Sequence, residues 1–184
     1  MSPAAFLSQE ELESGRYMCV YSFSKTYSMT GWRLSYVVSS TPLIRTITNI
    51  LNSTNTNVST AVQKAGAVAL TGSQECVAQM CEGYRRRRDV ALKVLRDIGR
   101  YAYTPHGAFY LLLDVGDKLN HAYGVHQLVF DVLKKRNVAV APGNVFGAVS
   151  RNFVRISLGA SEHDIEHGVR EICEFSKRGT DSLV

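Results

Sequence analysis

The sequence predicts an α/β protein with two unequal parts. Short, mostly apolar runs typical of buried strands alternate with longer segments in which apolar residues recur at helical spacing. Hydrophobic residues make up 45% of the 184 residues and charged residues 20%, which is typical of a folded globular chain. From these patterns we expect part of a larger domain over residues 1–72, a long connecting helix over 73–99 and a compact α/β domain over 100–184.

The first part begins with a polar, acidic segment that predicts a loose arm or a short helix. Met18–Phe23 is an apolar run that predicts a buried strand, and Arg33–Val38 predicts a second strand. A hydroxyl-rich loop, Ser24–Gly31, separates them, and helices are expected over residues 42–52 and 61–70. Two strands alone cannot satisfy their own edges, so we expect them to belong to a larger parallel sheet with helices on both faces.

The second part predicts a denser series of elements. After a helix over about residues 75–98, the expected elements are a strand at Ala108–Val115, a helix at 124–136, strands at Val138–Ala141 and Phe153–Leu158, and a final helix. Ser161 is expected to cap that last helix in a capping box with Asp164. This series can form an α/β domain by itself.

Charge and cysteine content narrow the functional classes. The net charge is +5, and the sharpest basic feature is Arg85–Arg88. Four consecutive arginines on a helix point in all directions and acidic residues lie nearby, which favours a partly paired surface over a nucleic-acid interface. His163 and His167 lie opposite the apolar face of the last helix, so we expect no metal site. The cysteines form no metal-like cluster and no apolar run is long enough to span a membrane, so we expect a cytoplasmic protein.

Chemistry is concentrated in the segment Ser22–Tyr36, which reads SFSKTYSMTGWRLSY. A lysine at the end of a buried strand, here Lys25, is held rigidly and partly desolvated, which favours the neutral amine that Schiff-base formation requires. The nearby hydroxyl groups and the guanidinium of Arg33 can hold an oxyanion. An amine beside a phosphate cradle would suit a phosphorylated aldehyde cofactor. Composition alone leaves open that the segment is an ordinary loop.

The segment resembles the cofactor-attachment signature of the class I and II aminotransferases, which are fold-type I enzymes that use pyridoxal 5′-phosphate (PLP). The resemblance implies that Lys25 binds the cofactor covalently and is the catalytic residue. It implies that Ser22 and Arg33 bind the cofactor phosphate and that Ser24 belongs to the same cofactor-binding motif. One departure is Ser35, where this family usually has glycine or alanine.

Three later segments also resemble this family: PHGAFYLLLDV at Pro105–Val115, VAVAPGNVFG at Val138–Gly147 and NFVRISLGAS at Asn152–Ser161. The last of them implies that Arg155 binds the α-carboxylate of the substrate. Without the resemblance, a surface arginine at a strand end is the simpler interpretation. The resemblance covers roughly residues 17–178.

The resemblance assigns residues 1–72 to a residual part of the PLP-binding large domain, 73–99 to an interdomain helix and 100–184 to the C-terminal small domain. It implies a homodimer, similar to aspartate aminotransferase, that moves an amino group from an amino acid to a 2-oxo acid. In this family an aspartate that faces the pyridine nitrogen precedes the lysine, whereas residues 1–24 contain no aspartate. We therefore expect the C-terminal part of such an enzyme.

Two alternatives stay open at this point. The chain could be a truncated, non-catalytic remnant that serves at most as an oligomerising or interaction module. It could also belong to a fold-type I lyase or synthase, because those enzymes share the lysine motif. The sequence does not identify the amino acid substrate.

Overall fold

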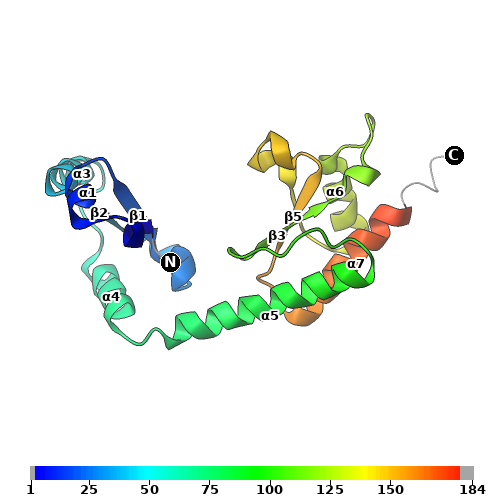
Figure 1. The fold of residues 1–184 in the computed structure, drawn as a ribbon, viewed down its shortest axis with the longest axis horizontal. Helices are drawn as coiled ribbons and strands as arrows, with labels where there is room; N and C mark the ends of the chain where they lie inside the picture. Colours follow the sequence, from blue (N-terminus) through cyan, green and yellow to red (C-terminus); the bar gives the residue numbers. More distant parts are fainter. Residues whose placement is uncertain (1–2, 179–184) are drawn as a thin grey trace. The chain divides into compact units, whose positions relative to one another are not determined.

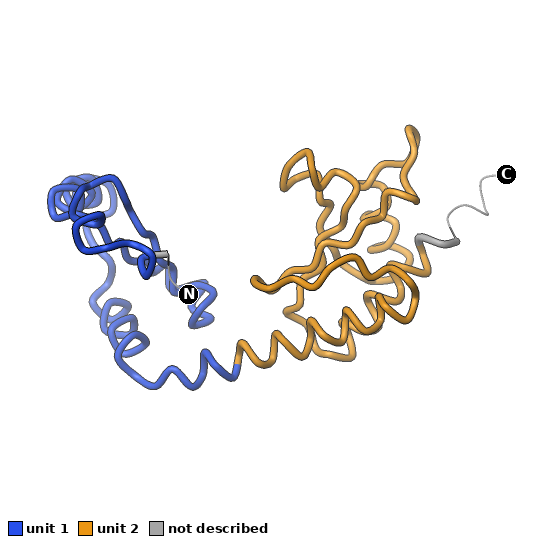
Figure 2. The backbone as a smooth tube through the Cα atoms, in the orientation of Figure 1, with its two compact units in different colours: residues 1–79 blue, residues 80–184 orange. Residues whose placement is uncertain are grey.

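The computed structural model describes residues 3–178 and divides into two compact units. We call Met1–Gln79 the N-terminal unit and Met80–Val184 the C-terminal unit, and Figure 2 shows them in different colours. Each unit is considered by itself below. The order of the elements follows the α/β pattern that the sequence predicts (Figure 1).

The N-terminal unit contains one small sheet and several helices. Its elements are the 3-10 helix η1 (Pro3–Phe6), α1 (Gln9–Glu13), β1 (Met18–Ser22), α2 (Phe23–Thr26), η2 (Thr30–Trp32), β2 (Ser35–Ser39), α3 (Thr41–Thr54) and α4 (Thr60–Thr71). β1 and β2 pair antiparallel, with Met18 opposite Ser39 and Ser22 opposite Ser35. The expectation that these strands lie in a parallel sheet is wrong for this pair. The two short helices between them turn the chain straight back, whereas a parallel pair needs a longer crossover.

The apolar cluster of the N-terminal unit is small. It consists of Phe23, Met29 and Leu34, against which α4 packs through Val62 and Ala65. Many other apolar side chains of this unit stay exposed, among them Val20 at 61%, Val38 at 36% and Val68 at 70%. β1, β2 and α4 thus keep apolar surface that their own unit does not cover.

The long helix α5 (Glu75–Asp97) confirms the helix predicted over residues 75–98. Its last turns bury Ala91, Leu92, Val94 and Leu95 in the C-terminal unit. The basic run before them is paired on the helix surface: Arg85 with Glu82, Arg86 with Glu162, Arg88 with Asp89, and Arg87 over the ring of Tyr84. This agrees with the partly paired surface that the sequence favours.

The C-terminal unit has a three-stranded antiparallel sheet in the order β3-β5-β4. After α5 its elements are β3 (Tyr110–Asp114), η3 (Gly116–Lys118), α6 (Val125–Arg136), β4 (Ala141–Pro142), η4 (Gly143–Phe146), η5 (Ala148–Ser150), β5 (Phe153–Ser157) and α7 (Glu162–Arg178). The strand expected at Val138–Ala141 is shorter and later than predicted. Val138 and Val140 pack against the core instead of extending the ladder, so only Ala141 and Pro142 pair with β5.

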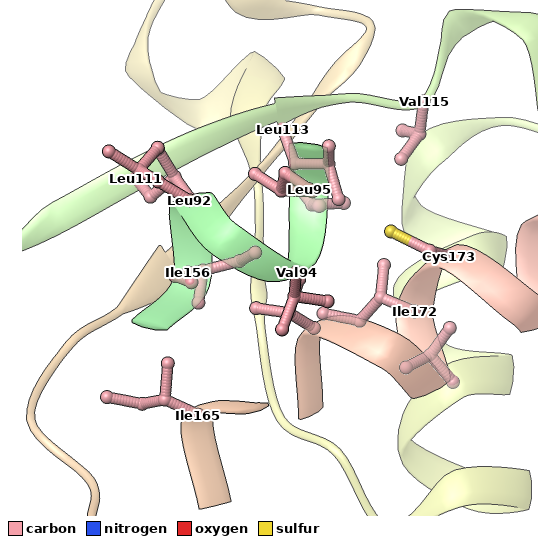
Figure 3. Close-up of a cluster of buried hydrophobic side chains, with 14 of the residues drawn as sticks. Leu92, Val94, Leu95, Leu111, Leu113, Val115, Ile156, Ile165, Ile172 and Cys173 are labelled. Carbon is pink, nitrogen blue, oxygen red and sulfur yellow. The ribbon is translucent and has the colours of Figure 1, made fainter. Parts of the chain in front are cut away.

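One face of this sheet forms the main core of the protein. Leu111 and Leu113 of β3 and Ile156 of β5 point toward buried side chains of α5 and α7 (Figure 3). Val154 of β5 and buried side chains of α6 belong to the same core. Because side chains alternate along a strand, the residues between them lie on the opposite face. That face carries Arg155 and is only partly covered.

The start of α7 confirms the predicted cap. The Asp164 N–H donates to Ser161 Oγ at 3.1 Å, and the Ser161 hydroxyl donates to Asp164 Oδ2 at 2.7 Å. The hydrogen bond from Ser161, followed by that from His163, holds the pKa of Asp164 below its ordinary value. His163 and His167 are both exposed on this helix.

Two features of residues 3–178 concern metal binding and membrane insertion. No group of three potential metal-ligating His, Cys, Asp or Glu side chains occurs among them. None of their helices is long and apolar enough to cross a membrane.

Candidate active site

The lysine predicted to be catalytic lies in a one-turn helix and not in a loop. Lys25 is in α2, which follows β1 directly, and Ser22 caps this helix by accepting a hydrogen bond from the Ser24 N–H at 3.1 Å. Phe23, the first residue of the turn, is 3% exposed and donates its N–H to the carbonyl of Leu34 at 3.2 Å. Burial of this ring and the backbone bond fix where Lys25 leaves the sheet.

The predicted phosphate-binding residues are joined to this turn by hydrogen bonds. The Thr30 hydroxyl donates to the Ser24 carbonyl at 3.0 Å, and Arg33 Nη1 donates to the Thr30 carbonyl at 3.0 Å. With the Ser22 cap, these bonds connect Ser22, Ser24 and Arg33 within one compact segment that also holds Lys25. The structure therefore brings together the four site residues that the sequence places in this unit.

The sequence predicted that the second strand begins at Arg33, but the structure places Arg33 before this strand. Its backbone is in the left-handed region at φ 52° and ψ 47°, and β2 begins only at Ser35. This conformation is uncommon for a residue with a side chain. It turns the chain between η2 and β2, which the alternating pattern of a strand cannot reveal.

The expectation of a desolvated lysine is not met by the residues described. Lys25 is exposed, as are Ser22 and Arg33. The strand that precedes Lys25 is not buried either, since Met18 is 52% exposed and Val20 61%.

Sequence reasoning missed a hollow of about 500 Å³ that lies beside the lysine turn. Its lining residues are Val20, Tyr21, Ser22, Phe23, Thr26, Tyr27, Tyr36, Val38 and Leu70. The rings of Tyr21 and Tyr36 stack at 4.9 Å, and Phe23 meets Tyr36 edge-on at 5.7 Å. The Tyr27 hydroxyl donates to Gln74 Oε1 at 3.0 Å. These tyrosines support the turn by packing, a role that the sequence could not separate from cofactor contact.

The predicted carboxylate-binding arginine is in the C-terminal unit, on the central strand of the sheet. Arg155 lies opposite Leu112 on β3 and opposite Ala141 on β4. Its guanidinium carbon is 4.2 Å from the ring centroid of Tyr110 and 4.1 Å from that of Phe146. Within residues 3–178 the guanidinium has no carboxylate in ion-pair distance. A planar guanidinium of this kind is suited to bind a carboxylate with two parallel hydrogen bonds.

The two rings beside Arg155 were also missed by sequence reasoning. Tyr110 lies on the neighbouring strand, and Phe146 lies at the end of η4 after the Pro142–Gly143 turn. The only available signal was the position of these aromatics within the segments PHGAFYLLLDV and VAVAPGNVFG. The pattern of one segment does not show which residue of another segment it will meet.

Comparison with known proteins identifies the family. The sequence model described as "Aminotransferase class I and II" matches residues 2–172. The chain belongs to the class I and II aminotransferase family. Within this family, the chain is 31% identical over 157 residues to the LL-diaminopimelate aminotransferase of Dehalococcoides mccartyi, covering 85% of this chain and 39% of that protein.

Further class I and II aminotransferases give the same picture. The probable aspartate/prephenate aminotransferase of Aquifex aeolicus is 35% identical over 175 residues, which cover 94% of this chain and 43% of that protein. The crystal structure of the aromatic aminotransferase from Pyrococcus horikoshii OT3 matches with a TM-score of 0.82 and 30% identity, covering 96% of this chain and 46% of that one. The chain thus spans less than half the length of these relatives.

Proposed function

We propose that this chain is the C-terminal part of a PLP-dependent aminotransferase that transfers an amino group from an amino acid to a 2-oxo acid. In this proposal residues 1–72 belong to the PLP-binding domain, residues 73–99 form the interdomain helix and residues 100–184 form the small domain. The relatives named above are transaminases of different substrates, which supports the reaction type and leaves the amino acid open.

The observation that carries the proposal is the hydrogen-bonded turn around Lys25. Lys25 lies in the same one-turn helix as Ser24, Ser22 caps this helix, and Thr30 links Ser24 to Arg33 by hydrogen bonds. These groups fit PLP, because the amine can bond to an aldehyde while hydroxyl and guanidinium donors suit a phosphate. Arg33 uses one N–H for the Thr30 carbonyl, so other N–H groups of its fork can serve an anion. Bound PLP supplies an electron sink for the amino acid.

The protein's own residues would then divide the work. Lys25 Nζ would hold the cofactor and, once released by the amino substrate, would take the proton from the substrate Cα and deliver it to the cofactor. Ser22 and Arg33 would hold the phosphate, with Ser24 in the same cofactor-binding motif. Arg155 orients the substrate carboxylate, and this orientation reduces the entropic cost of reaction.

The proposal is tested by reacting the chain with PLP, reducing with borohydride and mapping the labelled peptide. We expect the label on Lys25, and we expect loss of that label in Lys25→Ala. Lys64→Ala is the matched control, because Lys64 is an exposed lysine of α4 in the same unit. Pyridoxal, which lacks the phosphate, should label Lys25 more weakly than PLP, and Arg33→Ala should reduce that difference. Label spread equally over the exposed lysines would contradict the proposal.

An assay of amino transfer on the PLP-treated chain tests the alternative of a non-catalytic module, which the exposure of Lys25 favours. A chain that keeps PLP on Lys25 but does not transfer an amino group would be such a module. A product from amino acid and PLP that is not a 2-oxo acid would indicate a lyase or synthase of the same fold.

A homodimer and a cytoplasmic location complete the proposal. The dimer is supported by the exposed apolar side chains Val20, Val38 and Val68, which need a cover. The location is supported by the free cysteines Cys19, Cys76, Cys81 and Cys173. Size-exclusion chromatography with light scattering measures the oligomeric state, and a monomer would contradict the first point.

A further inference from the structure

The guanidinium of Arg155 contacts two aromatic rings. Its central carbon is 4.2 Å from the Tyr110 ring centroid and 4.1 Å from the Phe146 ring centroid. Both distances are well inside the range of about 6 Å for cation–π contacts. Arg155 is half-buried, whereas Phe146 is 49% exposed. The exposed ring of Phe146 therefore contacts an arginine that has no acidic partner within residues 3–178.

The ring of Tyr110 is held by the sheet. Arg155 pairs with Leu112, so Tyr110 lies two residues along β3 on the same face and is a diagonal neighbour of Arg155. The ring of Tyr110 is supported in turn by Phe109, at 4.4 Å between centroids, and Phe109 contacts Tyr84 of α5 at 5.4 Å. This ring cannot move away from Arg155 without disturbing a row of aromatic contacts.

The ring of Phe146 is held by a braced turn. The Ser150 hydroxyl lies 2.8 Å from the carbonyl of Gly143 and 3.1 Å from that of Gly147, and it can donate to either. Asn144 Nδ2 and His126 Nε2 are hydrogen-bonded at 2.9 Å, which ties the turn to α6. Gly147 has φ 126°, a value that only glycine adopts easily, so the chain leaves Phe146 in a direction set by this residue. These hydrogen bonds and the conformation of Gly147 thus hold the turn that carries the Phe146 ring.

We propose that Tyr110 and Phe146 are positioning residues that form an aromatic clamp on Arg155. The proposal rests on the proposed function, in which Arg155 binds the substrate carboxylate. Two rings against the guanidinium restrict the directions from which a ligand can approach it, and all of its N–H donors point outward in its own plane. A carboxylate would then bind in that plane through two parallel hydrogen bonds. Because the clamp orders the side chain beforehand, binding does not have to immobilise it.

The test of the clamp uses the full chain and phenylglyoxal, which modifies accessible guanidinium groups. The rate of Arg155 modification is read by peptide mapping in the wild type, Tyr110→Ala and Phe146→Ala. We expect each alanine variant to react about threefold to tenfold faster, as the loss of one cation–π contact predicts. Tyr110→Phe and Phe146→Tyr keep a ring and should react at the wild-type rate. Phe130→Ala is the matched control, because Phe130 is 57% exposed on α6 in the same unit.

A second arm adds pyruvate, a small 2-oxo acid, as a competitor. We expect pyruvate to protect Arg155 in the wild type and in the two ring-preserving variants, and to protect it several-fold less well in the alanine variants. Far-UV circular dichroism checks that each variant keeps its helices. Equal modification rates in the wild type and both alanine variants would overturn the clamp. Faster rates without protection by pyruvate in any protein would support the clamp and contradict the carboxylate role of Arg155.

Discussion

The two units of this chain bury their apolar residues to very different extents. The C-terminal unit has a continuous core to which α5, α6, α7, β3 and β5 all contribute (Figure 3). The N-terminal unit buries Phe23, Met29 and Leu34 around the lysine turn, while strand residues such as Val20 remain exposed. The stability of a unit follows the apolar area that it removes from water. We therefore expect the C-terminal unit to be the more stable one by itself.

The same difference separates the two candidate site residues Lys25 and Arg155. Arg155 contacts two rings of its own unit. Lys25 is placed by local hydrogen bonds but stays exposed, so its unit fixes its position without supplying its environment. A site residue can thus be positioned by short-range contacts, whereas its chemical tuning needs a complete surrounding core.

The largest effect on stability is expected when a buried leucine of each unit is replaced by alanine. Leu128→Ala in α6 deletes a side chain that is 1% exposed and should cost about 2–5 kcal/mol of unfolding free energy. Leu34→Ala, at 9% exposure in the smaller cluster, should fall at or below the low end of that range. Hydrogen exchange measured by mass spectrometry reads both units separately, because each peptide reports the stability of its own segment.

The control for these two substitutions is Leu70→Ala, since Leu70 is 46% exposed on α4. Its effect on either unit should be small. Fluorescence of Trp32, the single tryptophan of the chain, reports only on the N-terminal unit. A Leu128→Ala protein whose two units lose protection together would show that the units unfold cooperatively and would break the comparison.

A smaller test compares two glycines at close contacts. A methyl group at Gly143 would lie 2.6 Å from the carbonyl oxygen of Phe153 and nearer still to that of Ser150. These are backbone atoms that cannot rotate away, so Gly143→Ala should destabilise the C-terminal unit by about 1–3 kcal/mol. A methyl group at Gly66 would collide with Leu34 Cδ2, the end of a side chain that can rotate.

Gly66→Ala should therefore cost less than Gly143→Ala, because alanine also favours the helix α4 by up to about 1 kcal/mol. Gly107→Ala is the control, since a methyl group there would meet no atom within 4 Å. Thermal unfolding followed by circular dichroism ranks the three variants. A Gly143→Ala protein as stable as the Gly107→Ala protein would show that the turn before β5 can rearrange.

The smallest expected effect is a pH dependence of the C-terminal unit. Burial, the hydrogen bond to Asp131 and the charge of that carboxylate raise the pKa of Tyr123 from 10.0 to about 12. Burial alone would raise the pKa of Asp131, but hydrogen bonds from Tyr123 and Gln127 and the charge of Lys135 hold it below its ordinary value. The hydrogen bond between Tyr123 and Asp131 measures 3.0 Å.

The pKa shifts of Asp131 and Tyr123 make the C-terminal unit less stable at low pH and at high pH, respectively. The contribution of Asp131 is present above pH about 4 and is lost as the pH falls through its lowered pKa. The contribution of Tyr123 is fully present below pH 10.0 and is lost as the pH rises toward about 12. Asp131→Asn should reduce the loss of unfolding free energy at low pH and at high pH by about 1 kcal/mol or less, as measured by urea unfolding. An unchanged pH dependence in this variant would show that other groups set the pH response.

The sequence by itself determined the order of the elements and the identity of the motif residues. Apolar spacing placed α5 correctly, and the Ser161–Asp164 pair placed the cap of α7 correctly, because both features depend on residues within one segment. The resemblance of SFSKTYSMTGWRLSY to the family's signature marked Ser22, Lys25 and Arg33 as candidates. The structure keeps these three within one short segment, because the hydrogen bonds that brace it span only a few residues.

Only the tertiary structure decided how segments far apart in the chain meet. The sequence did not predict the antiparallel pairing of β1 with β2, the exposure of Lys25 or the two rings that contact Arg155. A repeating pattern shows which residues of a segment share a face, but it does not show which other segment covers that face. The contacts of Arg155 depend on Tyr110 and Phe146, which reach it only when β3, β5 and the turn after β4 have packed together.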